Sequence, residues 1–285
     1  MRLNPFNTGN INVRSSGGGG FPGGGGGKIG CGTLVIAAIG ALVFGLDPMQ
    51  TIGVVESVQQ GSATGGGTAS TDEQEICSRG PYSTEACNAL QSLNQTWAPE
   101  FQRAGIQFEQ PFLDLYTGGG VRSGCGSAPA AAGPFYCPAD KGIYINTSFY
   151  ETLEQRMGAG GDFARLYVLA HEYGHHIQNL TGLAGQVRSA QAQDRRRANQ
   201  LQVRMELQAD CYAGVWAGKN RNLIEPGDMQ EGLRAASAIG DDTLTQGQVS
   251  PENFTHGTSQ QRVDALRRGI ESGDDTACDV YFQNV

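Results

Sequence analysis

The stretch Leu169-Ala170-His171-Glu172-Tyr173-Gly174-His175-His176 decides how this chain is read. It contains His171-Glu172-x-x-His175, a pattern typical of zinc-binding helices. Residues four apart on a helix lie about one turn apart, so the two imidazoles can bind one ion. Apolar residues from Leu166 to Leu180 fall on the opposite side of the same helix. The pattern therefore predicts an amphipathic helix whose polar face carries the motif.

The ends of this helix are also marked in the sequence. Asp162 is expected to cap the N-terminus, and Gly182 stands where a left-handed residue would end the helix. A short motif can nevertheless arise by chance in a helix, and paired histidines often lie on the surface. A third metal ligand is needed to distinguish a metal site from a chance pattern.

A hydrolytic zinc site has three protein ligands and one open position for water. One class of zinc hydrolases extends the motif to H-E-x-x-H-x-x-G-x-x-H. This chain has Gln178 at the glycine position and Thr181 at the final histidine position, which excludes that class. The other class takes a carboxylate from a later helix. The stretch Arg204-Met205-Glu206-Leu207-Gln208-Ala209-Asp210 offers Glu206 for this role.

Glu206 and Asp210 fall on the apolar, small-residue face of the helix predicted for this stretch. Buried carboxylates are costly unless a cation or strong donors compensate them. Zinc bound to Glu206, with Asp210 accepting the outer N–H of a metal-binding histidine, would satisfy both. The alternative is a buried salt bridge to Arg204 or Arg165, which needs no metal.

These residues predict one zinc ion per chain, bound by His171, His175 and Glu206. Zinc lowers the pKa of its bound water toward ~7 and polarises a carbonyl group. Glu172 is the expected general base, which favours a peptidase. A zinc-stabilised binding or assembly module without turnover is one alternative, although a structural site needs no base. A zinc hydrolase acting on cell-wall amides would use the same chemistry.

His256 is a further candidate catalytic residue. It stands in the polar stretch Thr255-His256-Gly257-Thr258-Ser259, and His176 falls toward the buried face of its own helix. An imidazole donor near the metal could stabilise the negative charge that develops on the carbonyl oxygen. The alternative is a loop histidine that caps the following helix or bonds a backbone carbonyl.

Several segments resemble a family of bacterial neutral zinc metallopeptidases, which are membrane-anchored and zincin-like. The resemblance implies zinc and a zincin-like fold more firmly than it implies any substrate. The segments lie between about residue 85 and the C-terminus. They are Tyr136-Cys137-Pro138-Ala139-Asp140, His171-Glu172-Tyr173-Gly174-His175-His176-Ile177-Gln178, Glu206-Leu207-Gln208-Ala209-Asp210-Cys211, Ala238-Ile239-Gly240-Asp241-Asp242 and His256-Gly257-Thr258-Ser259-Gln260-Gln261-Arg262.

The first 75 residues differ in composition from the rest. Residues 1–28 contain no acid, and glycine occupies nearly all of 17–27, which predicts a disordered tail. Ile29–Leu46 is an uncharged apolar run just long enough to span a bilayer. We interpret it as a transmembrane signal anchor, with a cleaved signal peptide or a buried core helix as alternatives. Residues 47–75 are expected to form a flexible linker.

The charges on the two sides of this apolar run predict its orientation. Arg2, Arg14 and Lys28 precede it, whereas acidic residues follow it, so the tail is expected in the cytoplasm and the domain outside. The protein would then be a single-pass protein of the cell membrane. The chain has 28 acidic and 20 basic residues, and an acidic exported domain argues against nucleic acid as a partner. A peptide or protein substrate is expected.

Six of the seven cysteines follow the apolar run, and Cys31 lies within it. An even number of cysteines in an oxidising compartment predicts disulfides. Short loops favour Cys77–Cys87 and Cys125–Cys137, which leaves Cys211 for Cys278, although six cysteines allow other connectivities. The chain has no C-x-x-C pair, which argues against a cysteine zinc site.

Residues 76–285 are expected to form one mainly helical α+β domain. Cys87–Trp97 has helical periodicity that Pro99 should end or kink, and Gly142–Asn146 reads as a strand. That strand would either align an extended substrate at a sheet edge or be an ordinary buried strand. A second strand is expected at Phe108–Tyr116, and further helical regions at Gln186–Lys219, Leu233–Gly240 and Ser259–Glu271.

Four arginines lie in the long helical region Gln186–Lys219. They are expected on a solvated face, with recognition of a substrate carboxylate as the alternative. They are Arg188, Arg195, Arg196 and Arg197.

Overall fold

The computed structural model describes residues 1–16 and 73–283. The predicted anchor Ile29–Leu46, with Cys31, lies outside these ranges, as does nearly all of the predicted linker. Within the described ranges, no helix combines the length and the apolar character that a membrane span requires.

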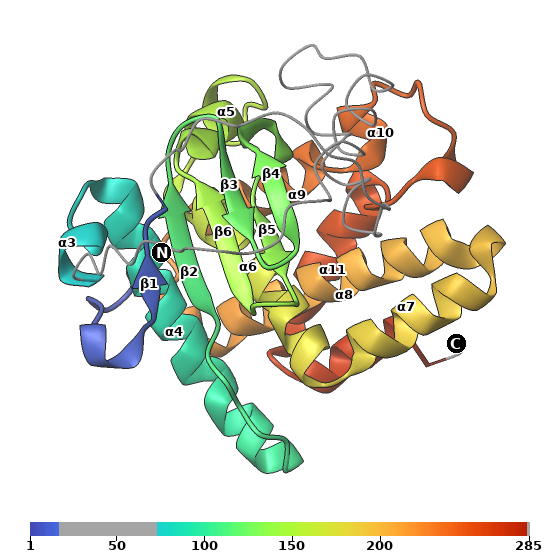
Figure 1. Cartoon of the computed structure of the whole chain (residues 1–285). Coiled ribbons are helices and arrows are strands. Elements are labelled where there is room, and N and C mark those ends of the chain that lie inside the picture. The colour runs from blue at the N-terminus through green and yellow to red at the C-terminus, as the bar shows by residue number, and fades with distance from the viewer. Residues whose placement is uncertain (17–72, 284–285) are drawn as a thin grey trace.

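A four-stranded sheet forms one layer of the molecule (Figure 1). Its strand order is β1 (Val13–Arg14), β2 (Phe112–Tyr116), β6 (Gly142–Asn146) and β5 (Phe135–Cys137). The first three strands are parallel, and β5 runs antiparallel to β6. All five residues of β6 are buried between neighbouring strands. The predicted strand at 142–146 is therefore an ordinary buried strand, and its alternative role at a substrate-aligning sheet edge is wrong.

An antiparallel hairpin of β3 (Gly120–Ser123) and β4 (Gly126–Pro129) lies between β2 and β5 in the chain. Helices make up most of the rest of residues 73–283, so the mainly helical α+β prediction is confirmed for the part of the chain that the structure describes. The helices are α3 (Glu73–Cys77), α4 (Pro81–Ala104), α5 (Ser148–Gln155), α6 (Asp162–Leu180), α7 (Leu183–Gln193), α8 (Ala198–Lys219), α9 (Asp228–Ala238), α10 (Asp241–Leu244) and α11 (Ser259–Ser272).

Pro99 is expected to end or kink helix α4; the helix continues through Pro99 to Ala104, so the first of these two alternatives is wrong. Proline removes one backbone hydrogen bond, and this loss destabilises a helix that has no tertiary contacts to compensate for it. Here Trp97 and Phe101, one turn apart on either side of Pro99, are both buried in the core. The packing of these two side chains therefore stabilises the helix at the proline that would otherwise interrupt it.

Helix α6 carries the motif and lies between the sheet and the pair α8–α11 (Figure 1). The helix is buried on both faces. Its polar residues His171, Glu172 and Gln178 are buried, as its apolar residues are. Asp162 is its first residue and not its cap, since Gly161 precedes the helix. Gly182 follows the helix with φ of 79°, in the left-handed conformation that the sequence predicts.

Residues 1–16 are folded onto the domain, so the predicted disordered tail over 1–28 is wrong for this part. Strand β1 pairs with β2, and Met1, Ile11 and Val13 are buried in the main core. The composition argument failed because the glycine run at 17–27 dominated it. The few apolar residues that dock the segment stand before that run.

Side chains of α4 hold the backbone of this N-terminal segment. Asn88 and Gln91 accept hydrogen bonds from the amides of Phe6 and Asn7, at 2.8 and 2.6 Å. The terminal ammonium of Met1 lies 2.8 Å from both Asp162 and Asp228. These acids begin α6 and α9, so the N-terminal segment is fastened to the first turn of the motif-bearing helix.

This packing bears on the predicted membrane arrangement. A strand and its neighbours in one sheet must lie on the same side of a membrane, and β1 pairs with β2. The predicted arrangement places residues 1–28 in the cytoplasm and the domain outside, on opposite sides of a span at 29–46. That orientation does not fit this structure.

Three disulfides link Cys77 with Cys87, Cys125 with Cys137 and Cys211 with Cys278. The predicted pairing is confirmed. The second bridge fastens the β3–β4 turn to β5, and the third fastens the C-terminal segment to α8.

Candidate metal centre

Helices α6 and α8 cross very closely at Gly174, inside the motif. A Cβ atom at this position would lie 2.8 Å from Cα of Ala209 and 2.9 Å from its carbonyl oxygen. Any larger residue would push the helices apart. The crossing brings Glu206, three residues before Ala209, to the face of α6 that carries the two histidines.

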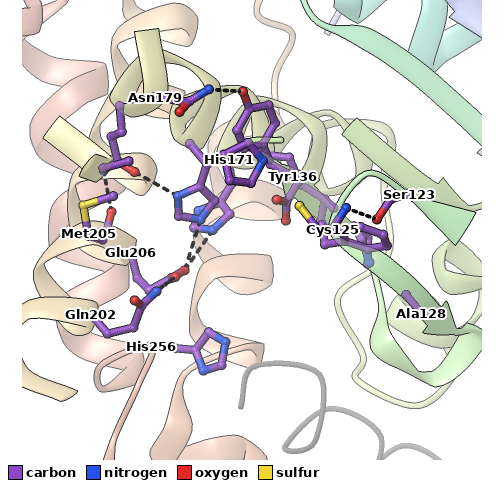
Figure 2. A pocket seen from close by; sticks show the side chains of 18 of the residues that line it. Ser123, Cys125, Ala128, Tyr136, His171, Asn179, Gln202, Met205, Glu206 and His256 are labelled. Carbon is purple, nitrogen blue, oxygen red and sulfur yellow. Dashed lines mark hydrogen bonds and ion pairs between the residues drawn. The ribbon is translucent and has the colours of Figure 1, made fainter. Parts of the chain in front are cut away.

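Figure 2 shows Glu206 pointing toward His171. The Oε2 atom of Glu206 lies 3.1 Å from Nε2 of His171 and 3.5 Å from Nε2 of His175. The other carboxylate oxygen accepts a hydrogen bond of 2.8 Å from Gln202. The structure therefore brings together the three residues that the sequence predicts as ligands.

The donor set fits a zinc ion. Zinc bonds of about 2.0–2.2 Å in tetrahedral geometry separate neighbouring ligand atoms by roughly 3.4 Å. The two distances from Glu206, 3.1 and 3.5 Å, lie on either side of this value. Two imidazole nitrogens and one carboxylate oxygen also leave a fourth position open, as a hydrolytic site requires.

Asp210 fixes the orientation of His171, the first of the two histidines. Its Oδ1 accepts a hydrogen bond of 2.7 Å from Nδ1 of His171 and one of 2.6 Å from the hydroxyl of Tyr167. A proton fixed on Nδ1 leaves Nε2 free to bind metal. This is the position that the sequence predicts for Asp210.

Arg262 was missed by the sequence reasoning. It lies on α11, is fully buried, and contacts both oxygens of Asp210 at 2.8 Å. Arg165 pairs instead with Glu85, and Arg204 bonds the carbonyl of Tyr281. A buried salt bridge is therefore present, but with a different arginine and in addition to the contact with His171. The available signal was a charged residue on the buried face of α11, in line with Ala265, Leu266 and Gly269.

Gln178 orients the second histidine and was also missed. Its amide nitrogen donates to the carbonyl of Met205 at 2.8 Å and to Gln208 at 3.0 Å. The amide oxygen is therefore turned toward His175, whose Nδ1 lies 2.9 Å away. Both histidines thus present Nε2 to the same place. In the sequence, Gln178 is notable only for standing where another class of zinc site has glycine.

In the metal-free site, the carboxylates favour protonated histidines, so a metal cation can replace those protons. Burial lowers the pKa of His171, but Asp210 and Glu206 outweigh it and raise that pKa to about 9. Burial raises the pKa of Glu206, yet His175 and His171 hold it well below its usual range. For Asp210, Arg262 and His171 overcome burial and lower the pKa to about 2. Metal binding at neutral pH is therefore expected to release protons from the imidazoles.

Glu172 lies beside the metal centre but is not one of its three predicted ligands. It is 8% exposed, and burial raises its pKa while the two neighbouring histidines lower it. Among the residues that the structure describes, none forms a hydrogen bond with its carboxylate. The group is thus free to bind a water molecule in the cleft.

The centre opens into a cleft of about 400 Å³. Gln202 and Glu206 lie on one side, and Ser123 and Ala128 of the hairpin lie on the other (Figure 2). The cleft lining is more apolar than polar, with Phe149 and Val168 near the motif. Its residues come from the hairpin, β5, α5, α6, α7, α8, α10, α11 and the segments around Ile239 and His256.

His256 lines the same cleft and is buried. Its Nδ1 lies 2.9 Å from Asp241, which also accepts hydrogen bonds from the amides of Thr255, His256 and Gly257. The other ring nitrogen, Nε2, is buried without a hydrogen-bond partner in the described part of the chain. Thr258 caps α11, so His256 has neither of the two structural roles considered as alternatives.

His176, the neighbour of the second ligand, has a structural role. Its Nε2 donates to the carbonyl of Glu109 at 2.7 Å, and its Nδ1 accepts from the hydroxyl of Tyr136 at 3.0 Å. Burial lowers its pKa to about 4, so the imidazole is neutral at pH 7. It fastens α6 to β5 and to the segment before β2.

Asp210→Asn is expected to weaken zinc binding by roughly 10- to 100-fold, because an amide holds the Nδ1 proton of His171 less firmly than a carboxylate. The change also leaves Arg262 buried without its counter-charge, which should cost about 3 kcal/mol of stability. Competition with a zinc chelator and urea unfolding of the metal-free protein measure the two effects. Asp264→Asn, on the exposed side of α11, is the matched control. Unchanged zinc affinity would show that Asp210 only supports the fold.

The comparisons with known proteins agree with this geometry. Residues 4–281 match the model of a family described as "Putative neutral zinc metallopeptidase". No solved structure matches the chain significantly.

Two bacterial relatives align over most of their length. The "Uncharacterized protein YpfJ" of Escherichia coli K12 is 44% identical over 225 residues, which cover 75% of this chain and 78% of the relative. The "Uncharacterized protein Rv2575" of Mycobacterium tuberculosis H37Rv is 40% identical over 206 residues, which cover 67% of each chain. Because the family model matches residues 4–281, nearly the whole length of the chain, this chain belongs to that family of neutral zinc metallopeptidases.

Proposed function

We propose that this protein is a zinc-dependent peptidase that hydrolyses peptide bonds outside the cytoplasm. The convergence of His171, His175 and Glu206 on one point, with Glu172 free beside it, carries this proposal. When bound, zinc supplies a Lewis acid and a water of lowered pKa. The same residues would hold a structural ion only with a fourth protein ligand, and no fourth ligand lies within the described cluster.

Glu172 acts as the proton carrier of the reaction. Its carboxylate takes a proton from the attacking water and gives it to the nitrogen of the leaving amine. Burial suits both tasks because it raises the pKa of the carboxyl group, while His171 and His175 limit that rise. The apolar lining of the cleft keeps other water molecules away from the proton.

His256 stabilises the oxygen of the carbonyl group under attack. Asp241 accepts from Nδ1 and so fixes the orientation of the ring, which leaves Nε2 for the substrate. A proton on Nε2 can be donated to a carbonyl oxygen that gains negative charge. Asp241 is thus a positioning residue, held in turn by three backbone amides.

A peptide is the substrate class that the cleft favours. Residues 126–128 of β4 line it. In the described part of the chain, β4 pairs along one edge only, with β3. The other edge offers backbone groups to which an extended peptide can add as a strand. The Cys125–Cys137 bridge keeps this hairpin in place.

The location outside the cytoplasm rests on the three disulfides, because such bonds persist in oxidising compartments. The N-terminal segment lies on the same side as the domain in this proposal. Attachment to a membrane by the apolar run 29–46 stays a prediction, but a single crossing there would place the N-terminal segment and the domain on opposite sides and is not part of this proposal.

Digestion of a peptide library by the full-length protein tests the function. Zinc-loaded wild type is expected to cut peptides, and zinc-loaded Glu172→Gln is not. If both proteins bind zinc and neither cuts, the binding or assembly module becomes the better interpretation. Cleavage that persists in Glu172→Gln contradicts the proposed mechanism.

His256→Ala is expected to keep zinc and fold but to lose roughly 10²- to 10³-fold in turnover. This is the usual effect of removing one donor to a developing oxyanion. Metal analysis and circular dichroism check the fold and the site, and initial rates on a cleaved library peptide measure turnover. Full activity in this variant would assign His256 and Asp241 to the support of the segment before α11.

A further inference from the structure

The geometry points to Arg188 as the residue that recognises a carboxylate of the substrate. The proposed peptidase would then prefer peptides that carry a negative charge close to the cleaved bond. This inference rests on the proposed function and adds a substrate class to it.

Helix α7 turns one face toward the cleft. Ala184, Val187, Arg188 and Gln191 all line the cleft, and their spacing of three and four residues places them on one side of the helix. Ala184, Val187 and Gln191 are buried, and the amide of Gln191 donates to the carbonyl of Ala198 at 3.0 Å. Arg188 is the exposed member of this face. Its side chain is therefore carried by a fixed helix and not by a loop.

Arg188 shares the cleft lining with a residue of a different element, Tyr136. Burial raises the pKa of Tyr136, and the positive charge of Arg188 opposes that rise. Tyr136 belongs to β5 and lines the cleft, where its hydroxyl accepts a hydrogen bond from Asn179. Arg188 of α7 and Tyr136 of β5 both line the cleft, so a substrate bound in the cleft can reach the guanidinium.

Every other arginine or acidic group that lines the cleft already has a role. Arg262 is buried and paired with Asp210, and Glu206 belongs to the metal centre. Glu172 is the proposed proton carrier. Arg188 differs because it is exposed and forms neither an ion pair nor a hydrogen bond with the described part of the chain. A guanidinium offers five donors in a planar fork that matches a carboxylate.

The charge balance of the cleft favours the same ligand. The charge of a bound zinc ion would be balanced by the carboxylates of Glu206 and Glu172, and Arg262 is paired with Asp210, so the positive charge of Arg188 has no counter-charge among the residues that line the cleft. The chain as a whole carries a formal net charge of −8. An exposed cation in the cleft of an acidic protein attracts acidic groups to the cleft, whereas the net charge of the molecule repels them elsewhere.

The other arginines of this region do not share these properties. Arg195, Arg196 and Arg197 do not line the cleft, and Arg196 contacts Asp194 at 3.5 Å on the surface. The sequence shows one cluster of arginines, whereas the structure separates Arg188 from the rest. The solvated-face interpretation fits the three exposed arginines, and recognition of a carboxylate is proposed for Arg188 alone.

The test compares cleavage profiles of full-length, zinc-loaded protein on a peptide library, read by mass spectrometry. Wild type is expected to favour Asp or Glu over Asn or Gln at one position by roughly 10-fold or more, the size of a charge-assisted hydrogen bond. Arg188→Gln should lose the preference, and Arg188→Glu should reverse it. Arg195→Gln removes the same charge outside the cleft and should match wild type. A second library with amidated C-termini separates side-chain carboxylates from the terminal carboxylate.

A binding measurement separates this inference from the proposed function. Zinc-loaded Glu172→Gln protein, with and without the additional change Arg188→Gln, is mixed with the same libraries, and retained peptides are identified. If wild type cuts nothing, the peptidase proposal fails, and the retained peptides still decide the role of Arg188. Enrichment of acidic peptides that depends on Arg188 supports the inference. The same set of retained peptides with and without Arg188→Gln would overturn it.

Discussion

Glu172→Gln is expected to reduce peptide cleavage by about 10²- to 10⁴-fold, the range for loss of a general acid–base catalyst. The amide has the size of the carboxyl group but cannot accept the proton of the attacking water. It also cannot return a proton to the leaving amine, so both halves of the reaction suffer. Initial rates at saturating substrate measure the effect on turnover itself.

The same variant should keep its zinc, because Glu172 is outside the ligand triad. Its stability should also change little, since no described residue forms a hydrogen bond with its carboxylate. Glu252→Gln changes a fully exposed carboxylate away from the cleft and serves as the control. Loss of zinc together with activity would mean that Glu172 binds the metal, which contradicts the assignment.

Glu206→Ala is expected to lose the metal. The zinc content of the dialysed protein should fall from about one ion per chain to a small fraction of that value, because only two imidazoles remain and neither replaces the charge of the third ligand. The change also removes the acceptor of the Gln202 amide. Metal analysis by plasma emission measures the result.

Two further variants make this outcome specific. Glu206→Gln keeps the volume of the side chain and a partner for Gln202, so zinc loss without unfolding is the expected result. Glu252→Ala should retain the full zinc content. If Glu206→Ala retains zinc at wild-type affinity, the third ligand is a different residue, and the close crossing at Gly174 has another purpose.

Features that depend on local spacing could be predicted from the sequence. The helix that carries His171 and His175 follows from periodicity, and its end before Gly182 follows from the conformation that glycine adopts. Glu206 could be selected because a carboxylate on an apolar helix face needs a compensating cation. Two of the disulfides followed from loop length, since nearby cysteines close small loops most easily, and the third was the pair that remained.

The errors came where distant contacts overrule a local signal. Pro99 predicts a helix end or a kink, yet α4 continues to Ala104. The side chains of Trp97 and Phe101, on either side of the proline, are buried in the core and stabilise the helix. The glycine run at 17–27 predicts a disordered tail, yet residues 1–16 form a strand of the sheet and place an ammonium beside Asp162. For the N-terminal segment, the stabilising contacts come from residues 82 and 84 positions away in the chain.

The sequence by itself determined the metal-binding motif, the identity of the acidic ligand and the helical class of the domain. Each follows from the order of residues along one or two helices, where geometry repeats about every 3.6 residues. Only the tertiary structure decided how these helices meet. Contacts between different elements give their roles to Arg262, to Gln178 and to the pair of His256 with Asp241. The periodicity of a single helix does not predict contacts of this kind. The separation of Arg188 from the surface arginines has the same cause, because a helix face acquires a function only from what is packed opposite it.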